Sequence, residues 1–267
     1  RPIQLYGQIH SVLYLSSESE NDIIAWDLKN AALLWKKEFD VDYDRMISID
    51  SVLYLRSDSS VAKISARTGA LLQNIQLEEK LAKGIAGAGD KIYICTESGD
   101  LQEFDQQLNS LGELDSNLPM VKAILQQGER LIAYNSRGSI RIVALENAHI
   151  EFSNDFGAEL YAAPCLTNGL VIVPFAAGTV AAYSLHDASL EWSFSAASLL
   201  NLDLLITNRC IIVVYARGQV VSIDAKNGVE QWQYDYGRSL NFAVLTRKGI
   251  LLGHRKEISL IGEKHAN

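Results

Sequence analysis

The residues of this chain that could do chemistry are its cysteines, histidines and carboxylates, and none of these types forms a recognisable motif. The cysteines are Cys95, Cys165 and Cys210, and the histidines are His10, His149, His186, His254 and His265. The cysteines lack the Cys-x-x-Cys spacing of zinc and redox sites, and the histidines fall at unrelated points of the chain. The carboxylates are dispersed, without the oxygen-rich clustering that calcium requires. The sequence therefore predicts no metal site, no catalytic residues and no cofactor.

Motifs for phosphate binding and acyl transfer are missing as well. The sequence has no G-x-x-x-x-G-K-[ST] loop and no G-x-S-x-G turn. The glycines of Lys83–Lys91 (KGIAGAGDK) have no helix after them, which indicates a flexible turn between strands. An odd number of cysteines cannot all be paired, and two of them adjoin strand-like runs. We interpret the cysteines as small apolar core residues; a reactive thiol is the alternative.

The composition limits which partners and locations are open to the chain. It has 267 residues, 48% of them hydrophobic, enough to bury a full core. A net charge of -8 repels phosphate backbones and argues against nucleic acid as a partner. The apolar runs have strand length, and none reaches the length of a membrane span. Because the sequence starts without Met or a signal peptide, we expect a processed or trimmed chain, with a lipid anchor possible in its precursor.

The elements that must position any functional residue repeat along the chain. Asp27 is followed eight residues later by Trp35, and Asp224 is followed in the same way by Trp232. The second position of this pair recurs at 35, 73, 113, 152, 192 and 232, at intervals of 38, 40, 39, 40 and 40 residues. Four residues after each first position stand small or turn-forming residues: Ala31, Gly69, Asn109, Ala148, Ala188 and Gly228. Six units at an even spacing predict a repeat architecture.

Each unit reads as strands. Runs rich in β-branched and aromatic residues, such as VLYLRSD and IIVVYARG, end in polar or glycine-containing turns. Four antiparallel strands in a repeat of about 40 residues are typical of a β-propeller blade. We predict an all-β fold, a seven-bladed β-propeller in one domain (residues 1–267), whose last blade is completed by an N-terminal strand at Arg1–Tyr6. The alternative is an eight-bladed propeller with a trimmed N-terminus.

The phrase A-x-D-x-x-x-G-x-x-x-W resembles the repeat of the quinoprotein-type (PQQ-like) propeller family. Its copies here include AWDLKNAALLW and SIDAKNGVEQW, with weaker forms AYSLHDASLEW and KISARTGALLQ. The resemblance implies that the tryptophan docks between adjacent blades and that the aspartate and glycine shape the preceding turn. The residues that match these structural positions are Trp35, Trp192, Trp232, Asp27, Asp224, Gly69 and Gly228.

The same resemblance bears on function. The enzymes of the family hold pyrroloquinoline quinone with calcium, several of them beside an adjacent Cys-Cys pair that this chain lacks. Its non-catalytic branch includes BamB-type subunits of the outer-membrane β-barrel assembly machine. We expect a non-enzymatic, monomeric, BamB-like scaffold that binds a protein of an envelope complex in the periplasm. This chain departs from BamB-type proteins in two ways: it lacks their lipidated N-terminal cysteine, and we expect fewer than their usual eight blades. The alternatives are a ligand- or peptide-binding sensor, which could be cytoplasmic, and a quinone-dependent dehydrogenase.

Turn residues suggest where a protein partner would bind. Arg137, Arg217 and Arg255 each lie three residues before an expected third strand, and Arg56 is close to equivalent on the second blade. The segments that enter the blades on this side contribute further tyrosines, arginines and leucines. Together the candidates are Arg56, Arg137, Arg217, Arg255, Tyr43, Arg45, Leu118, Leu199, Tyr236 and Arg238. Tyrosine and arginine are common anchors of protein interfaces, so we predict one partner-binding face.

Overall fold

The computed structural model of the protein describes residues 5–16, 21–115, 118, 120–147, 149–196, 198–246, 248–255 and 257–262. These residues form 27 β-strands and one 3-10 turn at Ala216–Gly218. The strands assemble into seven antiparallel sheets, six of four strands and one of three. The fold is therefore the predicted all-β, seven-bladed β-propeller.

The chain forms two compact units, Arg1–Asn135 with Ile140–Ile150, and Ser136–Ser139 with Glu151–Asn267. The first unit holds three complete sheets. The first sheet is β1 (Leu5–Ile9), β2 (Val12–Ser16), β3 (Asp22–Asp27) and β4 (Ala32–Glu38). The second is β5 (Arg45–Ile49), β6 (Val52–Arg56), β7 (Ser60–Ser65) and β8 (Leu71–Gln76). The third is β9 (Ala86–Ala88), β10 (Lys91–Cys95), β11 (Asp100–Asp105) and β12 (Ser110–Asp115).

The boundary between the units runs through the fourth sheet, and the second unit holds the last three. The fourth sheet is β13 (Ala123–Gln127), β14 (Arg130–Tyr134), β15 (Ser139–Ala144) and β16 (His149–Asp155). The fifth is β17 (Cys165–Thr167), β18 (Leu170–Pro174), β19 (Thr179–Ser184) and β20 (Leu190–Ser195). The sixth is β21 (Leu205–Ile206), β22 (Cys210–Val214), β23 (Gln219–Asp224) and β24 (Glu230–Asp235). The seventh is β25 (Phe242–Thr246), β26 (Gly249–His254) and β27 (Glu257–Ile261).

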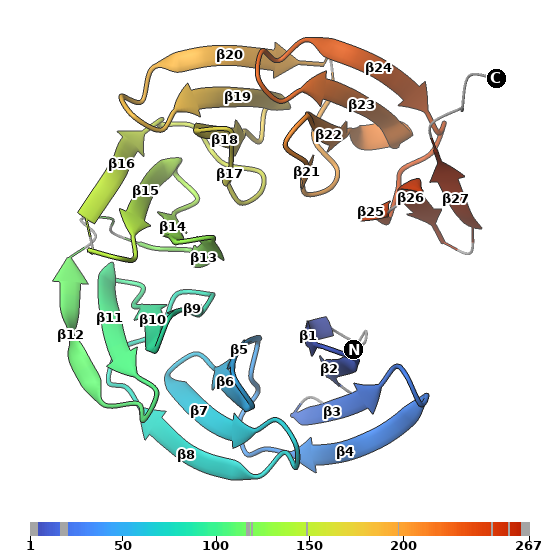
Figure 1. Ribbon diagram of the computed structural model, residues 1–267. Helices are drawn as coiled ribbons and strands as arrows, with labels where there is room; N and C mark the ends of the chain where they lie inside the picture. Colours follow the sequence, from blue (N-terminus) through green and yellow to red (C-terminus); the bar gives the residue numbers. More distant parts are fainter. Residues whose placement is uncertain are drawn as a thin grey trace. The chain divides into compact units, whose positions relative to one another are not determined.

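Within each sheet the strands follow one another in chain order, joined by short turns. In the first unit, Figure 1 shows the first strands β1, β5 and β9 on one side and the fourth strands β4, β8 and β12 on the opposite side. The third strand is covered by its neighbours in the first six sheets, whereas β27 of the seventh is largely exposed. The second residue of the third strand is at most 1% exposed in the first six sheets (Ile23, Val61, Leu101, Ile140, Val180 and Val220). This burial explains why the third strands read as apolar runs.

One predicted strand assignment is wrong. Residues 1–6 were expected to complete the last sheet, but Leu5 and Tyr6 belong to β1, which pairs with β2 in the first sheet. The reason is local: only His10 and Ser11 separate the two strands, and His10 has a φ of 52°, so the chain folds back as a tight hairpin. Residues 1–4 lie outside the described part of the chain. The organisation as one domain over 1–267 stays an expectation.

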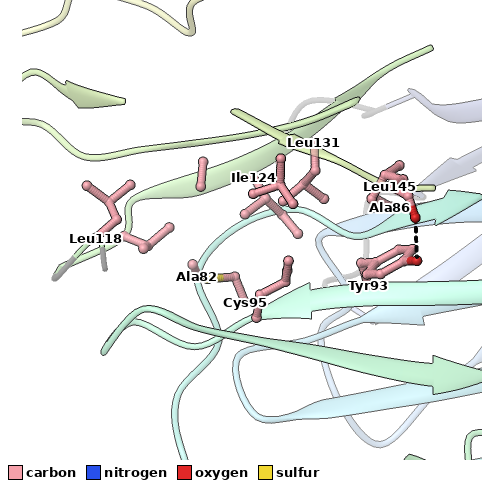
Figure 2. Packing of buried hydrophobic residues seen from close by; sticks show 12 residues of the cluster. Ala82, Ala86, Tyr93, Cys95, Leu118, Ile124, Leu131 and Leu145 are labelled. Atoms are coloured by element: carbon pink, nitrogen blue, oxygen red, sulfur yellow. Dashed lines mark hydrogen bonds between the residues drawn. The ribbon is translucent and has the colours of Figure 1, made fainter. Parts of the chain in front are cut away.

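A tyrosine in the second strand ties neighbouring sheets together in the first unit. The hydroxyls of Tyr14, Tyr54 and Tyr93 donate to the carbonyls of Ala66, Gln106 and Leu145, at 3.2, 2.9 and 3.4 Å. In each pair the acceptor follows the donor by 52 residues. Figure 2 shows the Tyr93–Leu145 bond beside the packed side chains of Cys95, Ile124 and Leu131. These bonds could have been predicted from the sequence, because tyrosine is the third residue of each of the runs VLYLS, VLYLR and KIYIC.

Candidate functional site

The aspartates of the repeat shape the turn between the third and fourth strands. Asp27 Oδ1 accepts a hydrogen bond from the backbone N–H of Lys29 at 2.9 Å, and its Oδ2 accepts one from Asn30 at 2.6 Å. These two bonds hold the pKa of Asp27 below its usual value. Asp224 Oδ1 accepts from the backbone N–H groups two and three residues further on, at 2.9 and 3.1 Å. Both carboxylates therefore act inside their own turns.

Two of the repeat tryptophans pack on the turn of the following sheet. Trp35 on β4 donates from Nε1 to the Ala66 carbonyl at 2.9 Å, and a Cβ at Gly69 would lie 2.7 Å from its ring. Trp192 on β20 packs in the same way on Gly228, where a Cβ would lie 2.6 Å from the ring. Trp35 and Trp192 are 8% and 7% exposed, and both glycines have positive φ. These contacts join neighbouring sheets.

Trp232 departs from this arrangement. It lies at the corresponding place on β24 but is 37% exposed, and no turn of the described residues packs on its ring in the way that Gly228 packs on Trp192. Instead it lines a mostly apolar cavity of about 500 Å³ in the second unit, with Tyr234, Leu245, Ile250 and Ile261. Its predicted role in docking a following sheet is therefore not fulfilled within the described chain.

Three residues of the predicted binding face are buried, which corrects the prediction for them. Arg56 is 1% exposed, and its guanidinium donates to Asp44 Oδ2 at 2.7 Å and to the Leu81 carbonyl. Arg56 is the last residue of β6, and its side chain points into the protein. The exposed turn begins only after it. Tyr43 packs edge-on against Phe39 in the core of the first unit. Leu118 is part of another buried cluster.

The segments that connect one sheet to the next are fixed by buried apolar residues. These anchors recur about every 40 residues and are all buried: Leu81, Val121, Leu160, Leu200 and Leu240. Tyr43 and Leu118 serve the same purpose in their segments. The residue before an anchor points outward, as Leu199 does with 60% of its surface exposed. Met120 is equally exposed beside Val121 in the first unit, and sequence reasoning missed it. The exposure of Met120 could have been predicted, because it directly precedes Val121, one of the apolar residues that recur about every 40 residues.

The remaining arginines of the predicted face lie at equivalent turns of the second unit. Arg137, Arg217 and Arg255 each stand two residues before the third strand of their sheet, β15, β23 or β27, and all three are exposed. The strands begin one residue earlier than expected, by the same amount in each sheet. With Leu199, Tyr236 and Arg238 these residues form what we call the loop face: Arg137, Leu199, Arg217, Tyr236, Arg238 and Arg255. Arg45 is exposed too but belongs to the first unit.

The turns that carry Arg137 and Arg217, and the corresponding turn of the fifth sheet, are held in place by backbone contacts. A Cβ at Gly138, Gly178 or Gly218 would collide with the carbonyl oxygen of the residue 20 positions further on: Ala158, Ser198 and Arg238. The Gly218 carbonyl also accepts a hydrogen bond from Tyr236 N at 2.9 Å. Each turn therefore rests on the segment that enters the next sheet.

Two of the arginines have an unusual backbone conformation. Arg217 and Arg255 have φ values of 66° and 50°, in the left-handed region that favours glycine. The Arg255 N–H donates to Asn241 Oδ1 at 2.8 Å, and Arg238 forms an exposed ion pair with Glu257 at 3.3 Å. Both side chains are exposed, so the left-handed backbone of these turns is occupied by residues that face solvent.

The thiols differ in environment. Cys95 is buried, and burial raises its pKa to about 12. Burial raises the pKa of Cys165 to about 12 as well. Cys210 lines the cavity beside Trp232. Among the described residues, no three His, Cys, Asp or Glu side chains come together to hold a metal ion. The same part of the chain contains no helix long and apolar enough to cross a membrane.

Alkylation should separate these thiols. At pH 8.5 we expect iodoacetamide to label Cys210 in the native protein and to label Cys95 only after unfolding in guanidinium, as read by peptide mass spectrometry. A thiol whose folded pKa is raised stabilises the fold below its unfolded value of about 8.5 and loses this contribution as the pH rises towards 12. Stability should therefore fall above about pH 9. Native labelling of Cys95 at the rate of Cys210 would contradict its burial.

Part of the chain matches one protein family in sequence, and most of the chain matches solved structures in fold. Residues 123–243 match the sequence model of a family described as outer membrane protein assembly factor BamB. No curated protein matches the chain in sequence. The crystal structure of BamB from Moraxella catarrhalis superposes with a TM-score of 0.71 and 12% identity, over 91% of this chain and 76% of that one. The sequence match agrees over these residues with the PQQ-like, BamB-like repeat that the motif indicated. The structural match shows that the two proteins share the propeller fold.

A second structural match shows how little the fold alone says about function. The computationally designed protein Ika8 superposes with a TM-score of 0.63 and 12% identity, over 96% of this chain and 95% of that one. A designed protein and a natural one thus share this architecture at the same identity. Function must be argued from the surface residues. Five of the six loop-face residues (Arg137, Leu199, Arg217, Tyr236 and Arg238) fall inside the segment matched by the BamB family model.

Proposed function

We propose that this PQQ-like, BamB-like propeller is a non-enzymatic scaffold that binds a protein partner of an envelope assembly complex in the periplasm. The observation that carries the proposal is the loop face, where exposed arginines, a tyrosine and a leucine stand on fixed turns of one unit. These residue types anchor protein interfaces: arginine and tyrosine supply directional contacts, and an exposed leucine supplies apolar area. The BamB family match over the same residues supports an outer-membrane assembly component as the partner.

The mechanism follows from the rigidity of the face. Because the turns rest on neighbouring backbone, their main chain needs little further ordering when a partner binds, which lowers the entropic cost of association. The arginines also provide local positive charge on a chain with a net charge of -8. We infer that they select a partner surface bearing carboxylates or exposed carbonyl groups and set its orientation. No covalent step is involved.

Charge reversal on the loop face tests the proposal. We expect Arg137→Glu/Arg217→Glu/Arg255→Glu to reduce recovery of the outer-membrane assembly component from envelope extracts at least tenfold, because three interface cations become anions. Recovery would be measured by affinity capture with quantitative mass spectrometry. The melting temperature should stay within a few degrees, since the three side chains are exposed.

A matched variant controls for the change in net charge. Arg67→Glu/Arg209→Glu/Lys226→Glu alters the charge equally, but these exposed residues lie in turns at the opposite ends of the strands. Recovery by this variant should equal that of the unmodified protein. Equal losses in both variants would point to non-specific attraction, and unchanged recovery by the loop-face variant would refute the proposal.

A further inference from the structure

The sequence contains two asparagine–glycine pairs, Asn168–Gly169 and Asn227–Gly228, and both lie in turns of the second unit. In such a pair the glycine nitrogen can attack the side-chain carbonyl of the asparagine, because glycine has no Cβ to obstruct the approach. The attack displaces the side-chain amide and is the first step of deamidation. Both asparagines are exposed. The surroundings of each glycine therefore decide whether its pair reacts in the folded protein.

The Asn227–Gly228 pair is held in place by three contacts. The Gly228 N–H donates to the Asp224 carbonyl at 2.9 Å, and a Cβ at Gly228 would lie 2.6 Å from the Trp192 ring. Asn227 Oδ1 accepts a hydrogen bond from the Val229 N–H at 3.0 Å. The attacking nitrogen and the side-chain carbonyl are thus both bonded to other groups. Their reaction would require breaking these two bonds and moving the glycine off a buried ring.

The Asn168–Gly169 pair has no such restraint on its glycine. The two residues form the turn of the hairpin between β17 and β18, where Thr167 pairs with Leu170 (Figure 1). Their φ values of 51° and 75° are those of a two-residue hairpin turn. No atom lies within 4 Å of a Cβ at Gly169, and no hydrogen bond among the described residues uses its N–H. The turn can therefore open without displacing any packed group.

The side chain of Asn168 links the fifth sheet to the sixth. Its Nδ2 donates to the Asn208 carbonyl, in the turn between β21 and β22, at 2.8 Å. Beside it, Thr167 Oγ1 donates to the Thr207 carbonyl at 3.4 Å. The Nδ2 atom that makes the first link is the atom that leaves in deamidation. Loss of this atom therefore removes a contact between two sheets.

We propose that Asn168 deamidates spontaneously in the folded protein, whereas Asn227 is protected until the protein unfolds. The Gly169 nitrogen bonds to Cγ of Asn168, the Cγ–Nδ2 bond breaks, and Nδ2 leaves as ammonia with the proton of the Gly169 N–H. A water molecule then opens the resulting succinimide at either carbonyl and yields aspartate or isoaspartate. The turn lies at the strand ends opposite the loop face, and the inference does not depend on the proposed function.

The reaction should loosen the contact between the fifth and sixth sheets. A carboxylate has no N–H to donate and would place a second acceptor beside the Asn208 carbonyl. Asn168→Asp reproduces one product, and we expect it to lower the melting temperature by about 2–4 °C. Asn227→Asp should lower it less, because a carboxylate there still accepts from the Val229 N–H. Equal melting temperatures for the two variants would contradict a role of Asn168 in joining the sheets.

Ageing of the folded protein tests the site directly. The full chain is incubated at pH 8.5, and peptides that span each pair are quantified by mass spectrometry through the mass increase on replacement of NH2 by OH. We expect deamidation of Asn168 to be at least fivefold faster than that of Asn227. In guanidinium the two rates should become similar, because the unfolded chain retains only the shared asparagine–glycine sequence. The pair at Asn227 thus serves as the internal control.

A variant tests the cause of the protection. Trp192→Leu removes the ring that packs on Gly228, so it should accelerate deamidation of Asn227 at least threefold and leave the rate at Asn168 unchanged. Circular dichroism would show that the variant keeps its strand content, and the comparison in guanidinium decides the proposal without any variant. Equal rates at the two sites in the folded protein would overturn the proposal. So would an unreacted Asn168 in folded protein after a period in which the unfolded chain reacts at both sites.

Discussion

Replacing Gly228 with alanine is expected to lower the free energy of unfolding by about 2–5 kcal/mol. Gly228 has a φ of 70°, a conformation that costs a residue with a Cβ about 1–2 kcal/mol. Its new methyl group would also lie 2.6 Å from Cδ2 and Cε3 of Trp192. Forcing a buried ring to move costs about a further 1–3 kcal/mol. Urea unfolding followed by circular dichroism would measure the loss.

The chain offers a control with the same backbone and open space. Gly237 has a φ of 75° and no neighbouring atom within 4 Å of an added Cβ. Gly237→Ala should therefore cost only the conformational part, about 1–2 kcal/mol. The difference between the two variants isolates the contact with Trp192. Equal losses would mean that the tryptophan ring yields without cost and that the docking of neighbouring sheets does not depend on the glycine.

These contacts explain why the fold could be predicted so far from the sequence. The turn and the tryptophan on which it packs belong to different sheets, so a motif such as that at Asp224–Trp232 fixes both a local turn and a neighbour. The even interval of about 40 residues predicts six sheets, and the three strand-like runs after Trp232 predict the seventh. The N-terminal strand was predicted to complete the last sheet, which is wrong, because the sequence of Leu5–Ile9 resembles that of any other strand. Only the short turn at His10 decides that it pairs with β2.

The binding face could be predicted only in part, for a physical reason. A sequence places an arginine in a turn to within a few residues, but burial changes with each residue along a strand. Arg56 ends a strand and is buried, whereas Arg137 and Arg217 follow their strands and are exposed. Likewise, exposure of Trp232 depends on what packs on it from the following sheet, and no local pattern carries that information.

The second large effect is expected at Arg56, whose assignment changed from surface to interior. Arg56→Met should lower the free energy of unfolding by about 3–5 kcal/mol, because it leaves Asp44 and the Leu81 carbonyl without their buried cationic donor. The change is measured by urea unfolding of the full chain. Adding Asp44→Asn should restore part of the loss, and the double-mutant cycle gives the coupling between the two side chains.

Arg45 is the natural comparison, because it stands directly opposite Arg56 in the pairing of β5 with β6 and is exposed. Arg45→Met should change the free energy of unfolding by no more than about 0.5 kcal/mol, as expected for a surface position. The two arginines were predicted to share one surface, so the experiment tests the assignment directly. If Arg56→Met cost as little as Arg45→Met, the ion pair between buried Arg56 and partly exposed Asp44 would contribute nothing to stability.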